Sequence, residues 1–145
     1  MSTLEERFSI ALHHTARVWR QAIDARLKDL GVGQAGWMAI AVVAKSATPL
    51  SQKELATLLS IEGPSMVATI DRLVRAGLVE RLASDADRRV KRIILTDGGR
   101  EVYAKVSAEA KSFRSATLSE VDRAALETAT AVLEALRAKI EREHD

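Results

Sequence analysis

Residues 51–77 limit the possible fold of this chain more than any other segment, because their capping and turn residues divide them into two short helices. The segment reads SQKELATLLSIEGPSMVATIDRLVRAG. Ser51 and Glu54 have the spacing of a capping box, which predicts a helix start. After a tight turn, Pro64 suits the first position of a second helix and Gly77 suits its C-terminal cap. Two helices joined by so short a turn are typical of a helix-turn-helix.

A β-hairpin is predicted directly after these helices. Leu78 to Ala83 and Val90 to Thr96 are rich in Val, Ile and Leu, and the charged sequence SDADRR separates them. This order of elements is that of a winged helix-turn-helix, expected here over residues 34–100. In such a fold the second helix presents its N-terminal residues to base edges in the major groove of DNA. The candidate groove-facing residues are Pro64, Ser65, Met66, Ala68 and Thr69.

The hairpin supplies the positive charge that the N-terminal half of the second helix lacks. Basic side chains can reach phosphates, and an arginine at the tip can enter the minor groove. The candidate DNA-contacting cations are Arg72, Arg88, Arg89, Lys91 and Arg92. Asp85 and Asp87 are interpreted as positioning groups, since a carboxylate near an arginine can hold its guanidinium in one orientation. The spacing does not decide between the two aspartates, and a merely solvated charged hairpin is the alternative.

Amphipathic helices are predicted on both sides of this unit, so we expect a mainly α-helical fold with a small β-hairpin wing. Residues 4–30 place apolar side chains at steps of three or four, and residues 34–45 are apolar nearly all round. A last helix is expected from Ser119. The stripes on residues 4–30 and 102–140 are longer than one small lobe can cover, which favours a homodimer over a single-chain core.

Composition narrows the class of protein. The chain has 145 residues, 47% of them hydrophobic, which is enough for one domain, and no apolar run is long enough to span a membrane. The N-terminus is acidic where a signal peptide is basic, so we expect a cytoplasmic protein without a membrane partner. The chain has no cysteine, which excludes disulfides and cysteine-ligated metals. A net charge of +2 is only mildly basic, so affinity for nucleic acid must come from where the charges lie.

No motif of catalysis, metal binding or cofactor binding is found in the sequence. There is no GxSxG, Walker loop, dinucleotide fingerprint or HExxH. His13 and His14 are adjacent, so on a helix they point about 100° apart and are poorly placed to hold one metal ion. We therefore expect no enzyme, no metal and no cofactor.

Two stretches carry a resemblance to a known family. IEGPSMVATIDRLVRAGLVER followed by SDADRRVKRIILT resembles the MarR family of bacterial transcription regulators, most closely its SlyA-like branch. ARVWRQAIDARLKDL and GWMAIAVV are also similar to that branch, so the resemblance covers essentially the whole chain. It implies one MarR-type domain over residues 1–145, in which residues 1–33 and 101–145 of two chains intertwine. It also implies that two winged lobes bind a pseudopalindromic operator in double-stranded DNA.

The resemblance implies roles for individual residues. Arg89 would enter the minor groove, Asp87 would position it, and Ser65 to Thr69 would face the major groove. Family members are often released from DNA by small aromatic acids or other phenolic compounds, which bind where the dimer helices meet the winged lobe. This effector pocket maps to Arg17, Arg20, Trp37 and Ala41. Core packing is the alternative role for Trp37, and simple exposure to water is the alternative for the two arginines.

Two positions depart from the SlyA-like pattern. Ala68 stands where relatives often carry an arginine on the recognition helix, so their operator sequence does not transfer. Ala41 stands where they carry a histidine one turn after the tryptophan, so their ligand does not transfer. We expect a homodimeric, sequence-specific DNA-binding repressor relieved by a small aromatic ligand. The alternatives are a winged-helix protein-interaction module that does not bind DNA and a small enzyme.

Overall fold

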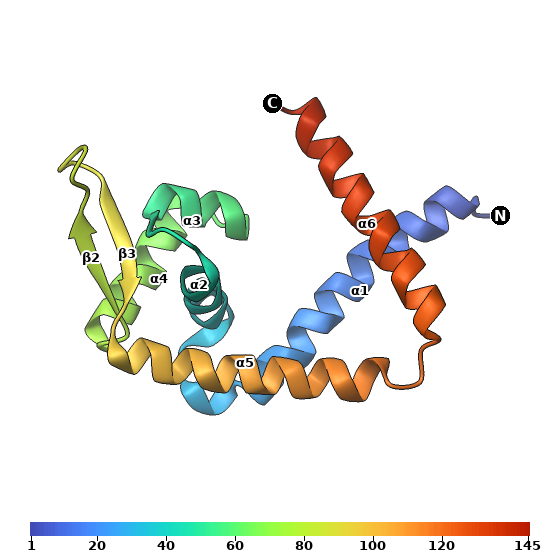
Figure 1. Ribbon diagram of the computed structural model, residues 1–145, viewed down its shortest axis with the longest axis horizontal. Coiled ribbons are helices and arrows are strands. Elements are labelled where there is room, and N and C mark those ends of the chain that lie inside the picture. The colour runs from blue at the N-terminus through green and yellow to red at the C-terminus, as the bar shows by residue number, and fades with distance from the viewer. The chain divides into compact units, whose positions relative to one another are not determined.

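The computed structural model describes the whole chain, residues 1–145, and divides it into two compact units, residues 1–111 and 112–145. The chain is mainly α-helical with a small antiparallel sheet, as predicted (Figure 1). None of its helices combines the length and the apolar character needed to cross a membrane. The elements in order are α1 (Leu4–Arg26), the 3₁₀ helix η1 (Lys28–Leu30), α2 (Gly33–Lys45), β1 (Leu50–Ser51), α3 (Gln52–Leu59), α4 (Gly63–Arg75), β2 (Val79–Ala83), β3 (Lys91–Leu95), α5 (Asp97–Leu118) and α6 (Arg123–Glu143).

Two helix ends differ from the sequence-based expectation. The first stripe runs to residue 30, but α1 ends at Arg26 and the chain continues as η1, which Gly31 ends in the left-handed conformation at φ 69°. The last helix begins at Arg123 and not at Ser119. Asp122 caps it by accepting a hydrogen bond from the Ala125 N–H at 3.0 Å, whereas the Ser119 hydroxyl donates back to the carbonyl of Ala116.

The predicted hairpin is part of a three-stranded antiparallel sheet of order β1-β3-β2. Strands β2 and β3 pair from Val79 opposite Leu95 to Ala83 opposite Lys91. The short strand β1, which the sequence did not predict, pairs Leu50 with Ile93 on the other side of β3. The sheet therefore joins the wing to the segment that leads into α3.

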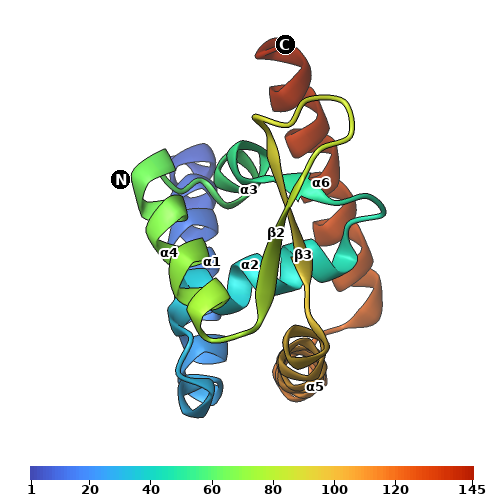
Figure 2. The same ribbon diagram turned by 90° about the vertical axis from the view of Figure 1, so that its left-hand side faces the viewer.

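One hydrophobic core holds α2, α3, α4 and the sheet together. Helix α4 contributes Met66, Ile70 and Leu73, which pack with side chains of the neighbouring elements. The other buried members are Ala39, Ile40, Leu55, Val79, Ile93 and Leu95. Figure 2 shows the two hairpin strands passing in front of α2, with α4 beside them. Helix α4 and the wing are thus built on the same core.

A tight junction fixes the base of the hairpin to the end of α4 and the start of α5. The Thr96 hydroxyl donates to the Gly77 carbonyl at 2.6 Å and accepts from the Gly99 N–H at 3.0 Å. Gly77 has a φ of 74°, which favours glycine. Gly99 lies so close to the Leu78 carbonyl oxygen that a Cβ at this position would be 2.0 Å from it. Only glycine fits at this junction.

Candidate nucleic-acid interface

The helix-turn-helix has the predicted punctuation. The Ser51 hydroxyl accepts the Glu54 N–H at 3.1 Å and starts α3. Ser60 then turns the chain in the left-handed conformation, at φ 53° and ψ 44°, and the Ile61 N–H donates to the Ala56 carbonyl at 2.9 Å. Pro64 lies in the first turn of α4, where its missing N–H costs no hydrogen bond. The turn between α3 and α4 is therefore a defined structure.

Helix α4 has one face in the core and one face in solvent. Met66 is 0% exposed and Thr69 is 3% exposed, so the expectation that these two side chains face DNA is contradicted. The reason is helical periodicity, because residues 66, 69, 70 and 73 share the inward face. Pro64, Ser65 and Ala68 are exposed as expected. Val67 joins them at 40% exposure.

A hollow of about 410 Å³ lies between α3 and the N-terminal half of α4. Its lining residues are Gln52, Lys53, Ala56, Thr57, Ile61, Gly63 and Val67. Lys53 is an exposed cation next to the outward face of α4, and the sequence analysis missed it. A single lysine on a polar helix face gives no sequence signal, because such residues are common on any solvated helix.

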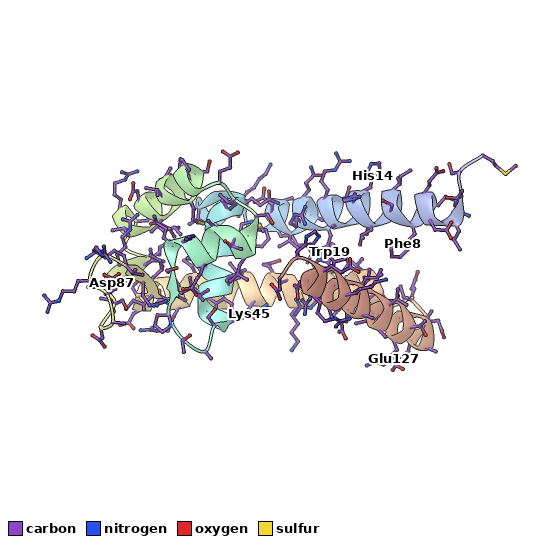
Figure 3. The ribbon with its side chains drawn as sticks, turned by 90° about the horizontal axis from the view of Figure 1, so that it is seen from above. Phe8, His14, Trp19, Lys45, Asp87 and Glu127 are labelled. Carbon is purple, nitrogen blue, oxygen red and sulfur yellow. The ribbon has the colours of Figure 1, made fainter.

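The tip of the wing holds Arg89 in a defined orientation. The Asp87 carboxylate accepts hydrogen bonds from Nε and Nη2 of Arg89 at 3.2 and 3.1 Å, and from the Arg89 backbone N–H at 3.0 Å. These bonds, first from the side chain and then from the backbone, lower the pKa of Asp87 below its ordinary value. Asp85 is exposed and makes no such bond. Asp87, which lies at the wing tip in Figure 3, is therefore the aspartate that contacts Arg89.

The other predicted cations differ in exposure and in the hydrogen bonds and ion pairs that they already form. Arg88 and Lys91 are exposed and form no ion pair. Arg72 is exposed and donates to the Thr69 hydroxyl at 3.3 Å. Arg92 is engaged within the lobe, since it donates to the Glu54 carboxylate at 3.0 Å and to the Pro49 carbonyl at 3.3 Å. The expected phosphate contact by Arg92 would have to compete with this ion pair.

Arg92 and Arg81 connect the wing strands to the helix-turn-helix. Hydrogen bonding by Ser51 and then by Arg92 lowers the pKa of Glu54 below its ordinary value. From β2, Arg81 donates to the Asp71 carboxylate on α4 at 2.6 Å and to the Gln52 side chain at 3.1 and 3.3 Å. Arg81 could not be identified from the sequence, because its partners are distant along the chain.

The predicted effector residues are only partly brought together. Arg20 lines a hollow of about 530 Å³, whose other walls are Gln34, Ala35, Met38, Leu58, Leu59, Ser60 and Ile61. Trp37 is buried and its Nε1–H donates to Asp24 at 2.9 Å, while Ala41 is partly buried, and neither lines this hollow. Arg17 is exposed and is also absent from the walls. No group of three or more acidic or histidine side chains is placed to hold a metal ion.

Taken together, the helix-turn-helix and the basic hairpin define a winged helix protein. Residues 30–90 match the sequence model of the MarR family. Over 93% of its length the chain is 36% identical to the transcriptional regulator PA3341, of which it covers 98%, with a TM-score of 0.86. The chain belongs to the MarR family.

More distant solved structures share the fold. MarR from Staphylococcus aureus, in complex with salicylate and kanamycin, is 20% identical over 97% of this chain and 94% of its own, with a TM-score of 0.83. The transcriptional regulator SlyA is 18% identical over 94% of this chain and 95% of its own, with a TM-score of 0.80. At these identities the likeness shows the fold alone, so the SlyA-like branch stays a prediction.

Proposed function

We propose that this protein is a homodimeric, sequence-specific DNA-binding regulator that acts as a transcriptional repressor. The observation that carries the proposal is the exposed guanidinium of Arg89, which Asp87 holds at the wing tip of the lobe that also exposes α4. A guanidinium fixed in this way enters a narrow minor groove without first losing its freedom of rotation. Helix α4 then lies in the adjacent major groove, which is about 12 Å wide and admits one helix.

Phosphate contacts come from cations around these two elements. Arg88 and Lys91 on the wing and Lys53 on α3 are exposed and unpaired. Such contacts fix the orientation of the protein on the duplex and make the affinity depend on salt. The mild net charge of the chain agrees with a localised basic surface, because binding needs only the charges on this face.

A second copy of the chain is the proposed cover for exposed apolar stripes on the terminal helices. In α1, Leu4, Phe8 and Leu12 are exposed at steps of four residues. In α6, Leu136 and Ile140 are exposed at the same spacing. Exposed stripes of this kind mark interfaces. A two-fold dimer would place two α4 helices about 34 Å apart, one DNA turn, on a pseudopalindromic operator.

The Arg20 hollow is the proposed effector site. Its volume of about 530 Å³ suits a small ligand, and the Arg20 guanidinium can pair with a carboxylate beside the apolar walls. A small aromatic acid has both features. Ser60 and Ile61 line the hollow and lie in the turn between α3 and α4, so a bound ligand would contact the segment that leads into the recognition helix.

Footprinting on the DNA that flanks the protein's own coding region, with and without salicylate, tests the proposal. We expect a symmetric protected site that salicylate weakens, and an affinity loss of about five- to 150-fold for Arg89→Ala. The rival is a winged-helix module that binds proteins and not DNA. DNA binding should weaken steeply with salt as counterions are released, so absent or salt-independent binding would favour the rival.

A further inference from the structure

The exposed N-terminal half of α4 is almost entirely apolar. Pro64, Val67 and Ala68 face solvent there, and Ser65 is the only polar side chain among them. Residues 63–71 include no Arg, Lys, Asn or Gln. The one carboxylate of this segment, Asp71, already accepts a hydrogen bond from Arg81 at 2.6 Å. Residues 63–71 therefore lack every side chain that makes bidentate hydrogen bonds to bases, and the nearest exposed cations are Arg72, further along α4, and Lys53 on α3.

The chemistry of base edges then restricts what this surface can recognise. Guanine is usually read by Arg or Lys and adenine by Asn or Gln, and residues 63–71 carry none of these side chains. The 5-methyl group of thymine is the apolar feature of the major groove, and apolar side chains read it by contact. We infer that Val67, with Pro64 and Ala68 beside it, selects thymine through its 5-methyl group. This inference rests on the proposed function, in which α4 occupies the major groove.

The surroundings of Val67 suit such a contact. Val67 lies at the edge of the hollow between α3 and α4, where Ala56 and Ile61 supply further apolar wall. Gly63 also lines the hollow and has open space beside it, since an added Cβ would meet nothing within 4 Å. The polar side chains of the lining, such as Lys53, come from α3. A methyl group that projects from a base edge can therefore exchange water for contact with Val67.

The expected effect is modest and measurable. Burying one methylene-sized group is worth about 0.8 kcal/mol, which corresponds to about a fourfold change in affinity. Deoxyuridine lacks the 5-methyl group of thymidine but pairs with adenine in the same way. Replacing one thymine by uracil thus removes the methyl group and leaves the hydrogen-bonding pattern of the base pair unchanged.

The experiment uses the full-length protein and duplexes that it enriches from a random-sequence library. Each thymine of an enriched duplex is replaced in turn by uracil, and the dissociation constants are compared at one salt concentration. We expect about fourfold weaker binding of the wild type for at least one position per half-site. Val67→Ala should lose this sensitivity at that position. Val74→Ala is the matched control, because Val74 is 37% exposed near the other end of α4 and should leave the sensitivity intact.

Each result is decisive. Uracil without effect at every position would overturn the inference, and so would a folded Val67→Ala variant that keeps the full uracil sensitivity. Val67 is 40% exposed and outside the core, so Val67→Ala is expected to fold, and its unfolding by urea checks this. Failure to enrich any duplex would instead overturn the proposed function, so the two failures are distinguishable.

Discussion

Replacing Asp87 tests whether the proposed binding of DNA by the wing depends on holding Arg89 in place or only on the positive charge of the wing. The carboxylate accepts hydrogen bonds from the guanidinium at 3.1 and 3.2 Å, and the Arg89 side chain is otherwise 92% exposed. Loss of Asp87 frees the guanidinium, which weakens binding. It also removes a negative charge near the phosphates, which strengthens binding. The two effects have opposite signs, so the direction of the change is informative.

Orientation is expected to be the larger effect. Ordering a rotamer-rich side chain on binding costs about two- to tenfold in affinity. The removed charge is solvent-exposed, and salt at about 0.15 M screens such charges beyond about 8 Å. We therefore expect Asp87→Ala to weaken operator binding by about two- to tenfold. Asp85→Ala removes the same charge at the same wing tip without touching Arg89, so it should leave binding unchanged or slightly tighter.

Fluorescence anisotropy with a labelled operator duplex at fixed ionic strength measures both variants. In an Arg89→Ala background, Asp87→Ala should not weaken binding further, because the guanidinium that it holds is already absent. The pKa of Asp87 is lowered, so its carboxyl group stays ionised in the pH range where an ordinary aspartate takes up a proton. The contact is therefore complete above that range and is lost only when the pH falls through the lowered pKa. Equal effects of the two alanine variants, or tighter binding by Asp87→Ala, would refute the positioning role.

The remaining predictions concern the stability of the winged lobe, measured by urea unfolding at fixed protein concentration. Arg81→Met should lower the free energy of unfolding by about 1 kcal/mol, because its partly buried contacts to α3 and α4 are lost, whereas the exposed Arg75→Met should have no effect. The folded-state pKa of Glu54 is depressed, so its contribution to the free energy of unfolding is present above about pH 4.5 and is lost as the pH falls through the lowered pKa. Glu54→Gln should therefore reduce the loss of stability in acid. An unchanged dependence of stability on pH would contradict this prediction. Gly99→Ala should cost more than about 3 kcal/mol, because its Cβ would overlap a backbone oxygen, while Gly63→Ala has open space and should cost little; similar losses for both would be the contrary result.

Residues that start or end helices explain why much of the fold could be predicted from the sequence. Pro64 and Gly77 mark the two ends of α4, and each acts through its own backbone, so the signal needs no knowledge of the tertiary structure. Elements without such a signal were missed or misplaced. Strand β1 has only the residues Leu50 and Ser51, too few for an alternating pattern, and it exists because β3 offers a free edge. Ser119 lies close to Asp122, and both are good caps, so sequence alone could not choose between them.

The candidate site was predictable where its geometry is local. Asp87 and Arg89 are two residues apart, and their pairing follows from the turn at the wing tip. Met66 was misplaced because a contiguous block of residues was assigned to the groove, although its spacing of four residues from Ile70 already indicated the core face. The partners of Arg81 were out of reach, since Gln52 lies 29 positions away in the sequence. Contacts between residues so far apart depend on the tertiary fold and produce no periodic pattern in the sequence.

The ion pairs of Arg81 and Arg92 also limit how the proposed effector could act. Arg81 ties β2 to α3 and α4, and Arg92 ties β3 to α3, while Ile93 of β3 shares the core of the lobe. The wing and α4 therefore keep a fixed relation, so a ligand that separated them would have to break these ion pairs and open the core. The Arg20 hollow is lined by α1, α2, the end of α3 and the turn before α4, and by no residue of the wing. A ligand there is better placed to change the distance between the two lobes of a dimer. If it prefers a spacing other than one DNA turn, it weakens DNA binding by the same factor by which DNA weakens its own binding.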